Sequence, residues 1–298
     1  MMAAAQFSPL PDRAVLLVGG EDARGFLQGL VSNDVRRVAP DRAIYAALLT
    51  PQGKYLFDFF IAEHAGTLLL DVERARKDEL ARRLVLYRLR SKVTIEDATG
   101  ALAVAAVLGE AGSAALGTGA TPGSARAFDG GLAFTDPRLA ALGARVVLPL
   151  ADGFGALAAL GLARVDGAEY DRLRLVLGVP DGSRDLVVDK SFLLENNFEE
   201  LNGVDFDKGC YVGQELTART KFRGVVRKRL FRVDVDGPLP EPGTPVRLGD
   251  KEIGWVRSGR DDKALAFLRL EGVEEAAGAP LMAGAALLKP VKPDWARF

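Results

Sequence analysis

Residues 202–229 read NGVDFDKGCYVGQELTARTKFRGVVRKR and include Cys210, the single cysteine of the chain. Glycines on both sides of this cysteine allow a tight turn and the close approach of a ligand. The sequence also predicts a helix over 214–220. A thiol near a helix N-terminus, with Lys208 two residues away, is expected to have a lowered pKa and to be partly thiolate. Free cysteines are also commonly small buried hydrophobes, so a packed, inert thiol stays an open alternative.

Two runs of opposite charge meet at this cysteine. The stretch 217–233 holds seven basic residues and no acid: Arg219, Lys221, Arg223, Arg227, Lys228, Arg229 and Arg232. The stretch 185–207 holds seven acids: Asp185, Asp189, Glu195, Glu199, Glu200, Asp205 and Asp207. Each run alone is typical of a solvated surface. Together they suit a ligand with a polar heterocycle at one end and carboxylates at the other, because carboxylates accept from ring N–H groups and arginine forks match carboxylates.

Composition excludes several classes of protein and site. The 298 residues carry 39 Lys and Arg against 40 Asp and Glu, a net charge of −1, which excludes binding of nucleic acid by bulk charge. One cysteine excludes an intramolecular disulfide and a cluster held wholly by cysteines of this chain. One histidine, His64, excludes two-histidine iron and three-histidine zinc sites. We therefore predict no resident metal.

The pattern of apolar residues also bears on the compartment. No run approaches the roughly 18 apolar residues of a membrane helix. The first 13 residues lack a positive region before an apolar stretch, so we expect no signal peptide. The sequence predicts a protein of the reduced cytoplasm, with no membrane partner.

The rest of the chain predicts an α+β body followed by a small all-β domain. Predicted strands of the body cover 43–50, 55–63, 67–73, 92–97, 102–108 and 145–150, and predicted helices cover 22–30, 75–89 and 155–162. A further helix follows Asp166, which resembles the first residue of a capping box with Glu169. After about residue 230 only short strands punctuated by Gly and Pro are expected, at 231–235, 244–248, 252–258, 265–270 and 286–289. We predict an α+β region of two subdomains over 1–230 and a β-barrel without helices over 231–298.

Two weaker features have ordinary explanations. Residues 153–158, GFGALA, match the dinucleotide pattern GxGxxA, but the chain lacks the run of βαβ units that such a site needs, so a turn entering a helix is the preferred interpretation. His64 lies in the sequence Glu-His-Ala-Gly, which predicts an exposed hairpin turn.

The octapeptide KGCYVGQE, residues 208–215, resembles the K-G-C-Y-x-G-Q-E signature of the YgfZ-type folate-binding proteins, which are relatives of the glycine-cleavage aminomethyltransferase. Three further segments are similar to family segments in the same order: 25–34 (GFLQGLVSND), 49–54 (LTPQGK) and 87–93 (YRLRSKV). The resemblance covers nearly the whole chain. It implies an aminomethyltransferase-like fold of three domains around a central cavity, the last a β-barrel. It also implies tetrahydrofolate, or a one-carbon-substituted folate, as ligand, and a role in assembling or repairing iron–sulfur clusters in client enzymes, tRNA-modifying ones included.

The resemblance also suggests site residues. Residues 193–197 resemble the P-L-E-A-G segment whose glutamate grips the pterin, so Glu195 is the pterin candidate. The paired Asp-Asp region of the transferase aligns with Phe57-Asp58 and leaves one carboxylate, and its folate-contacting asparagine aligns with Asp71. These departures weaken the case for aminomethyl transfer. The remaining candidates are the reactive thiol of Cys210 with Lys208, and the folate contacts Tyr211, Gln214, Arg223 and Arg227.

The sequence thus suggests three functions, which it supports to different degrees. The leading one is a folate-binding accessory protein, not itself an enzyme, whose one thiol lends a cluster ligand or forms a mixed disulfide during exchange. Its partners would be folate, iron–sulfur client proteins or cluster-assembly proteins. The second is a folate-dependent transferase of aminomethyl or methyl groups. An RNA-binding module over 217–233 is disfavoured, because only Phe222 and Phe231 could stack on bases there, and no DNA partner is expected.

Overall fold

The structure is a computed structural model that describes residues 5–298. The chain divides into two compact units. The first unit contains residues up to 49, 56–170 and 201–212, and the second contains 50–55, 171–200 and 213–298. The segment that carries Cys210 therefore belongs to the first unit, although it lies late in the sequence.

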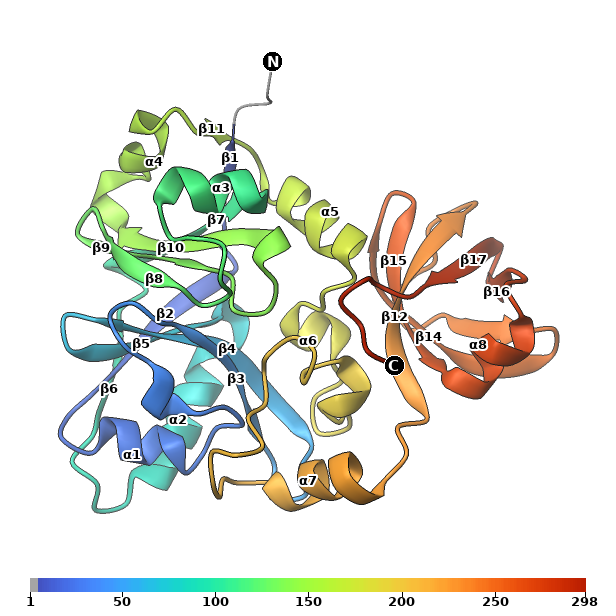
Figure 1. The fold of residues 1–298 in the computed structure, drawn as a ribbon, viewed down its shortest axis with the longest axis horizontal. Helices are drawn as coiled ribbons and strands as arrows, with labels where there is room; N and C mark the ends of the chain where they lie inside the picture. Colours follow the sequence, from blue (N-terminus) through green and yellow to red (C-terminus); the bar gives the residue numbers. More distant parts are fainter. Residues whose placement is uncertain (1–4) are drawn as a thin grey trace. The chain divides into compact units, whose positions relative to one another are not determined.

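One sheet of the first unit has five strands in the order β3-β4-β5-β2-β6 (Figure 1). These are β3 (Ile44–Leu49), β4 (Tyr55–His64), β5 (Thr67–Glu73), β2 (Arg13–Gly19) and β6 (Thr94–Asp97). Strands β4 and β5 form a hairpin in which His64 pairs with Thr67. Its turn residues Ala65 and Gly66 both have positive φ, at 49° and 77°, as expected where a two-residue hairpin loop follows the strand twist.

Helices α1 (Ala23–Gln28) and α2 (Lys77–Arg88) belong to the part of the first unit that contains the five-stranded sheet. Helix α2 lies against β2 and β6 (Figure 1). Its Leu80 and Leu84 are buried, which is the i, i+4 spacing of one helix face.

The second sheet of the first unit has six strands in the order β11-β1-β7-β10-β9-β8. They are β11 (Ala163–Arg164), β1 (Gln6–Pro9), β7 (Leu102–Leu108), β10 (Gly143–Pro149), β9 (Gly131–Thr135) and β8 (Ala125–Phe128). Helices α3 (Gly109–Leu116) and α4 (Gly155–Ala159) accompany this sheet (Figure 1). Its core contains Phe7, Val107, Val146 and Leu157.

The second unit contains a closed six-stranded barrel in the order β12-β15-β14-β13-β16-β17, in which β12 also pairs with β17. The strands are β12 (Lys228–Asp236), β13 (Pro245–Leu248), β14 (Lys251–Arg260), β15 (Lys263–Arg269), β16 (Leu281–Ala283) and β17 (Ala286–Val291). All neighbouring strands are antiparallel. Closure leaves no free sheet edge, so every strand finds backbone partners on both sides.

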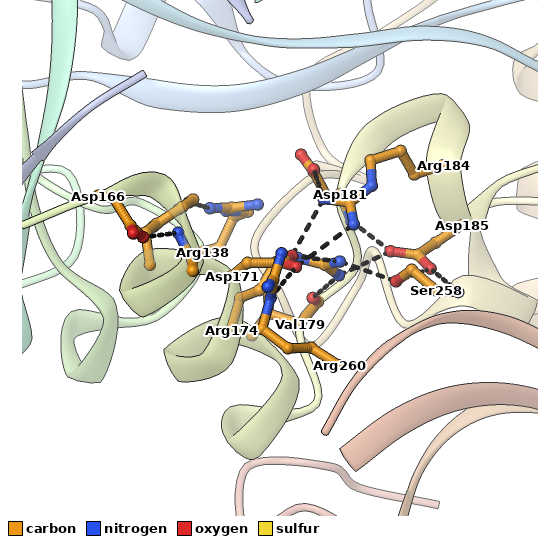
Figure 2. Close-up of polar contacts among 12 residues, drawn as sticks. Arg138, Asp166, Asp171, Arg174, Val179, Asp181, Arg184, Asp185, Ser258 and Arg260 are labelled. Atoms are coloured by element: carbon orange, nitrogen blue, oxygen red, sulfur yellow. Dashed lines mark hydrogen bonds and ion pairs between the residues drawn. The ribbon is translucent and has the colours of Figure 1, made fainter. Parts of the chain in front are cut away.

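The other helices of this unit are the end of α5 (Gly167–Leu177), α6 (Gly182–Asp185), α7 (Gln214–Arg223) and α8 (Leu270–Ala276). A buried polar cluster holds helical residues of the unit to barrel strand β14 (Figure 2). Arg174 of α5 donates to Asp185 of α6 at 2.8 Å and to Ser258 of β14 at 2.8 Å. Asp171 accepts from Arg174, Arg184 and Arg260. Because each buried charge is paired, the cluster fixes how these elements dock without leaving an orphaned ion.

The structure confirms the α+β class and the C-terminal β-barrel. The expectation of no helix after residue 230 is wrong, because α8 follows β15. A Cβ at Gly272 would lie 2.6 Å from Cγ2 of Ile253, so this glycine lets α8 pack directly on β14. The helix expected over 155–162 is shorter, ending at Ala159, and α3, β8 and β9 lie in a stretch for which the sequence predicted no elements.

The weaker sequence features are also clarified. Asp166 accepts the amide of Ala168 at 2.6 Å at the start of α5, as an N-terminal capping residue does. Helix α4, after the GFGALA segment, is five residues long and follows Phe154 in the left-handed conformation at φ 65°, which agrees with a turn entering a helix. The predicted hairpin turn is confirmed directly after His64, which pairs with Thr67 at the end of β4. The predicted exposure is wrong, because His64 is half-buried.

Candidate functional site

Two sequence motifs that lie about 180 residues apart are packed together in the first unit. The segment 202–212, which carries Cys210, lies along the segment 28–35 that follows α1. The backbone amide of Val212 donates to the carbonyl of Gly29 at 3.2 Å, and that of Asp205 donates to the carbonyl of Ser32 at 3.0 Å. The sequence identified both segments by resemblance, and the structure shows that they form one local assembly.

Side chains of the segment 28–35 complete this docking. Ser32 donates to the carbonyl of Gly203 at 2.6 Å and accepts the amide of Ala47 at 2.8 Å. Asn33 donates to the carbonyls of Tyr45 and Asn202, at 2.7 and 2.8 Å. Both side chains are buried, so their small polar groups replace water as partners of backbone groups.

Lys208 is the anchor of the Cys210 loop. Its Nζ donates to the carbonyl oxygens of Gln28, at 2.7 Å, and of Val31. The side-chain amide of Gln28 donates to the carbonyl of Lys208 at 3.0 Å. Burial lowers the pKa of Lys208 from 10.5 to about 8, and Asp34 and Asp205 only partly oppose this. The amine is thus committed to holding the loop, and its effect on the neighbouring thiol stays a prediction.

Cys210 is exposed. The alternative of a packed core cysteine is therefore wrong. Gly209 before it has φ of 92° and an added Cβ there would meet nothing within 4 Å, so the glycine serves the backbone conformation and not packing. Tyr211 after it is buried, with Nζ of Lys208 4.9 Å from its ring centroid. The loop thus buries the side chains of Lys208 and Tyr211 and leaves the thiol in solvent.

Asp71, the predicted folate contact, lies instead in a buried ion cluster of the first unit. Its Oδ1 accepts from Nε of Arg13 at 2.6 Å and its Oδ2 accepts from Nη1 of Arg145 at 2.5 Å. Arg145 belongs to β10 and Asp71 to β5, so this pair joins the two sheets. Since both carboxylate oxygens are bound to guanidinium groups, the contacts of Asp71 indicate a structural role.

The cluster continues from Arg145 to Asp136 and Arg138, which lie between β9 and β10, and to Tyr170 of α5. Arg138 donates to both oxygens of Asp136, at 3.0 and 2.8 Å, and Tyr170 accepts from Arg138 and Arg145 at 2.9 Å each. Burial alone would raise the pKa of Asp136, but Arg138 and Arg145 together lower it. The guanidinium of Arg145 also lies 3.9 Å from the ring centroid of Phe60. The two guanidinium groups therefore hold the Asp136 carboxylate in its ionised form.

Asp58 is buried on β4 beside this cluster, and its Oδ2 accepts a hydrogen bond from Tyr45 Oη at 2.8 Å. Burial raises the pKa of Tyr45 well above its usual value, and the Asp58 carboxylate raises it further. Tyr45 is therefore a neutral donor that holds one oxygen of Asp58.

The other candidates belong to the second unit. Glu195 is half-buried in the 3-10 turn Leu194–Asn196 and makes no hydrogen bond or ion pair with another described residue between 5 and 298. Burial raises the pKa of its carboxyl, while Lys228 and Arg229 act to lower it. Arg229 itself is bound to Glu200, at 3.0 Å. Gln214 begins α7 after Gly213, and Arg223 and Arg227 are exposed.

The sequence pointed to the loop but missed the partners of Asp71. A lone charge inside an otherwise apolar strand, such as Arg145 in GARVVLP, was the available signal, because buried charges are almost always paired. Within residues 5–298, no three His, Cys, Asp or Glu side chains are grouped as metal ligands would be. Over the same residues, no helix is both long and apolar enough to span a membrane.

Comparison with known proteins gives matches at the level of domains and of the whole chain. The GCVT N-terminal domain profile matches residues 14–128, and that of the CAF17 C-terminal beta-barrel domain matches residues 227–298. The crystal structure of aminomethyltransferase T from Bartonella henselae superposes with a TM-score of 0.78 at 15% identity, covering 99% of this chain and 87% of that one. The fold is therefore that of the aminomethyltransferases.

Similarity in sequence to two named relatives extends over most of this chain and most of theirs. The iron-sulfur cluster assembly factor IBA57, mitochondrial, of Homo sapiens is 36% identical, covering 96% of this chain and 84% of that protein. Its counterpart in Mus musculus is also 36% identical, over 89% of this chain and 78% of that protein. At this identity and coverage, the chain belongs to the family of the IBA57 iron–sulfur cluster assembly factors.

Proposed function

We propose that this chain is a tetrahydrofolate-binding accessory protein for the assembly or repair of iron–sulfur clusters in client enzymes, tRNA-modifying enzymes among them. The observation that carries the proposal is the loop at Cys210, where Lys208 is buried and bonded to two carbonyls while the thiol is exposed. Relatives with 36% identity bear the name of cluster assembly factors. An exposed thiol on a firmly held loop suits contact with a cluster carried by another protein.

The thiol can supply one ligand and no more. Iron in iron–sulfur clusters is held mainly by several cysteine thiolates, and the described residues offer no group of three candidate ligands. The cluster is therefore cargo, and the other ligands must come from a partner protein. We propose that Cys210 binds iron transiently while a cluster-assembly protein or a client holds the rest.

Folate binding finds support at Glu195 and not at Asp71. Glu195 is a half-buried carboxylate that makes no hydrogen bond or ion pair with residues 5–298, and Lys228 and Arg229 act on its charge. Such a group suits an acceptor for the adjacent ring N–H and amino donors of a pterin. Both oxygens of Asp71 are bound to Arg13 and Arg145, so a ligand would have to displace an ion pair there. Arg223 and Arg227 are exposed cations that could bind the glutamate tail.

Calorimetry with tetrahydrofolate tests the folate proposal. Glu195→Gln should weaken binding by about 2–5 kcal/mol, because it removes a charge-assisted acceptor. Glu215→Gln is the matched control, since the side chain of Glu215 is 84% exposed and pairs with Arg219 on α7. Unchanged affinity in Glu195→Gln would remove this residue from the site, and no binding by the unaltered protein would refute the folate half of the proposal.

The proposed contact of Arg223 and Arg227 with the glutamate tail of folate has a separate test. Arg223→Ala and Arg227→Ala should weaken polyglutamylated folate more than pteroate, which lacks the glutamate. Equal losses for both ligands would make these arginines irrelevant to the tail. The compartment stays a prediction: the sequence predicts the cytoplasm, whereas the named relatives in Homo sapiens and Mus musculus are mitochondrial.

A further inference from the structure

The last turn of α2 exposes large apolar side chains to solvent on the side that faces away from the sheet. Helix α2 buries Leu80 and Leu84, yet Val85, Leu86 and Leu89 are 47%, 76% and 87% exposed. Leu86 lies two residues after Leu84, which is about 200° around a helix and thus away from the sheet. Single exposed leucines are ordinary, but three large apolar side chains within five residues form a patch of the kind that marks an interaction site.

The backbone at Leu89 adds a second observation. This residue ends α2 with φ of 45° and ψ of −111°, a conformation that glycine adopts readily and a branched side chain does not. The Leu89 side chain is almost fully exposed, so packing within the fold does not account for it. A strained residue with no role in the core indicates that its side chain serves something outside the fold.

The polar groups around the patch are cationic. Arg82, Arg88 and Arg90 are exposed. Within residues 5–298, none of these three makes an ion pair, and Arg88 reaches only the carbonyl of Val93. Nearby Glu21 is already paired with Lys92 at 2.8 Å. A hollow of about 490 Å³ adjoins the patch and is lined by Gly20, Glu21 and residues 88–94.

We propose that the α2 surface, made of Arg82, Val85, Leu86, Arg88, Leu89 and Arg90, docks an acidic face of another protein. Leu86 and Leu89 enter an apolar depression of that partner, and the arginines pair with carboxylates around it. Guanidinium groups that make no ion pair with residues 5–298, beside exposed leucines, fit such a face, because interfaces combine an apolar centre with a charged rim of opposite sign. Leucine offers no ring for base stacking, so the chemistry favours protein over single-stranded nucleic acid.

The occupant can be captured by a photo-crosslinking amino acid placed at position 86 of the full chain in cells. The captured protein is then purified, and its affinity for the unmodified chain is measured by calorimetry. We expect Leu86→Ser and the double variant Arg88→Glu, Arg90→Glu each to lower that affinity at least about tenfold. Reversing an acidic residue of the partner should restore binding to the arginine variant.

The controls keep the same chemistry elsewhere on the first unit. Leu150→Ser changes a leucine that is 49% exposed, and Arg164→Glu changes an exposed arginine; both should bind the partner normally. Leu89→Gly separates docking from folding. It relieves the positive φ, so the protein should unfold at the same or a higher urea concentration while its partner affinity falls.

Several outcomes would overturn the proposal. These are equal affinities in the surface and control variants, a crosslink only within the chain or to a second copy of it, and a partner face without carboxylates. Binding of the unaltered chain to phosphatidylglycerol vesicles that is lost in Leu86→Ser, without any protein crosslink, would assign the surface to a membrane instead. Tetrahydrofolate affinity should be the same in all these variants, so failure here is distinguishable from failure of the proposed function.

Discussion

Lys208 and Arg145 are both buried cations of the first unit, but they meet different partners. Arg145, 3% exposed, is bound to the carboxylates of Asp71 and Asp136, and its pKa is raised despite burial. Lys208, 4% exposed, donates to neutral carbonyls, and burial lowers its pKa to about 8. Arg145 is therefore a permanently charged part of the core. Lys208, which anchors the loop that carries Cys210, is a cation that can lose its proton.

The largest effect should come from breaking the carboxylate-bound cation. Arg145→Met leaves two buried carboxylates with fewer partners, and removing one member of a buried ion pair typically destabilises by about 3–5 kcal/mol. Urea unfolding followed by circular dichroism measures this. Arg164→Met, at an exposed position, should change little. A loss below about 1 kcal/mol in Arg145→Met would mean that the cluster relaxes, and the contrast with Lys208 would disappear.

Removing the carbonyl-bound cation should have an intermediate effect. Lys208→Met leaves the carbonyls of Gln28 and Val31 without their donor, and an unsatisfied buried acceptor costs about 1–3 kcal/mol. The same urea experiment at pH 7 gives the loss. A loss of stability equal to that of Arg145→Met would show that carbonyl and carboxylate partners do not distinguish the two sites.

The pH dependence sharpens the contrast. Between about 8 and 10.5, Lys208 is largely neutral in the folded chain but still protonated in the unfolded chain. The unfolded state then binds more protons, so stability rises with pH through this window, by at most about 1.4 kcal/mol per pH unit. We expect the stability of the unaltered chain minus that of Lys208→Met to grow from pH 8 to pH 10.5. A flat difference would contradict the lowered pKa.

A smaller effect is expected at the side chain that supports the anchor. Gln28 donates to the carbonyl of Lys208 at 3.0 Å and accepts the amide of Val35 at 2.8 Å. Gln28→Ala should destabilise by about 1 kcal/mol and speed hydrogen exchange at residues 208–210. Gln52→Ala, an exposed glutamine, is the control. Unaltered exchange in Gln28→Ala would mean that Lys208 alone fixes the loop.

The sequence predicts the loop at Cys210 better than the buried ion cluster at Asp71, for a physical reason. The segments 25–34 and 208–215 are contiguous motifs, so a resemblance finds both, although nothing in the spacing says that they meet. Five of the six barrel strands are predicted because alternation and Gly-Pro punctuation are local signals, whereas the three-residue strand β16 is not predicted. The Asp71–Arg145 pair joins residues 74 positions apart, and no local pattern encodes that partner. The prediction of Asp71 as a folate contact therefore rests on the resemblance alone.

Helix α8 shows the same limit on a smaller scale. Its sequence, LEGVEEA, contains a glycine in the helix interior, which is locally unfavourable by about 1 kcal/mol relative to alanine. Contact with Ile253 on β14 requires that glycine. Tertiary packing overrode local propensity here, which is why an all-strand domain was predicted.

The smallest effect on stability, and the sharpest test of the loop, is expected at Cys210. The thiol is exposed, and surface substitutions away from special features seldom change stability measurably. Cys210→Ser should therefore unfold at the same urea concentration as the unaltered chain and bind tetrahydrofolate equally well. In cells that depend on this protein, it should nevertheless lower the activity of iron–sulfur enzymes, because serine lacks a thiolate ligand.

Lys208→Met should also lower these activities, since it retains the thiol but loosens the loop that presents it. If Cys210→Ser restores the enzymes fully while Lys208→Met does not, the loop matters through its shape, and the thiol is dispensable. If both restore them, neither the anchor nor the thiol contributes to cluster assembly, and the second unit with Glu195 becomes the part of the chain to test.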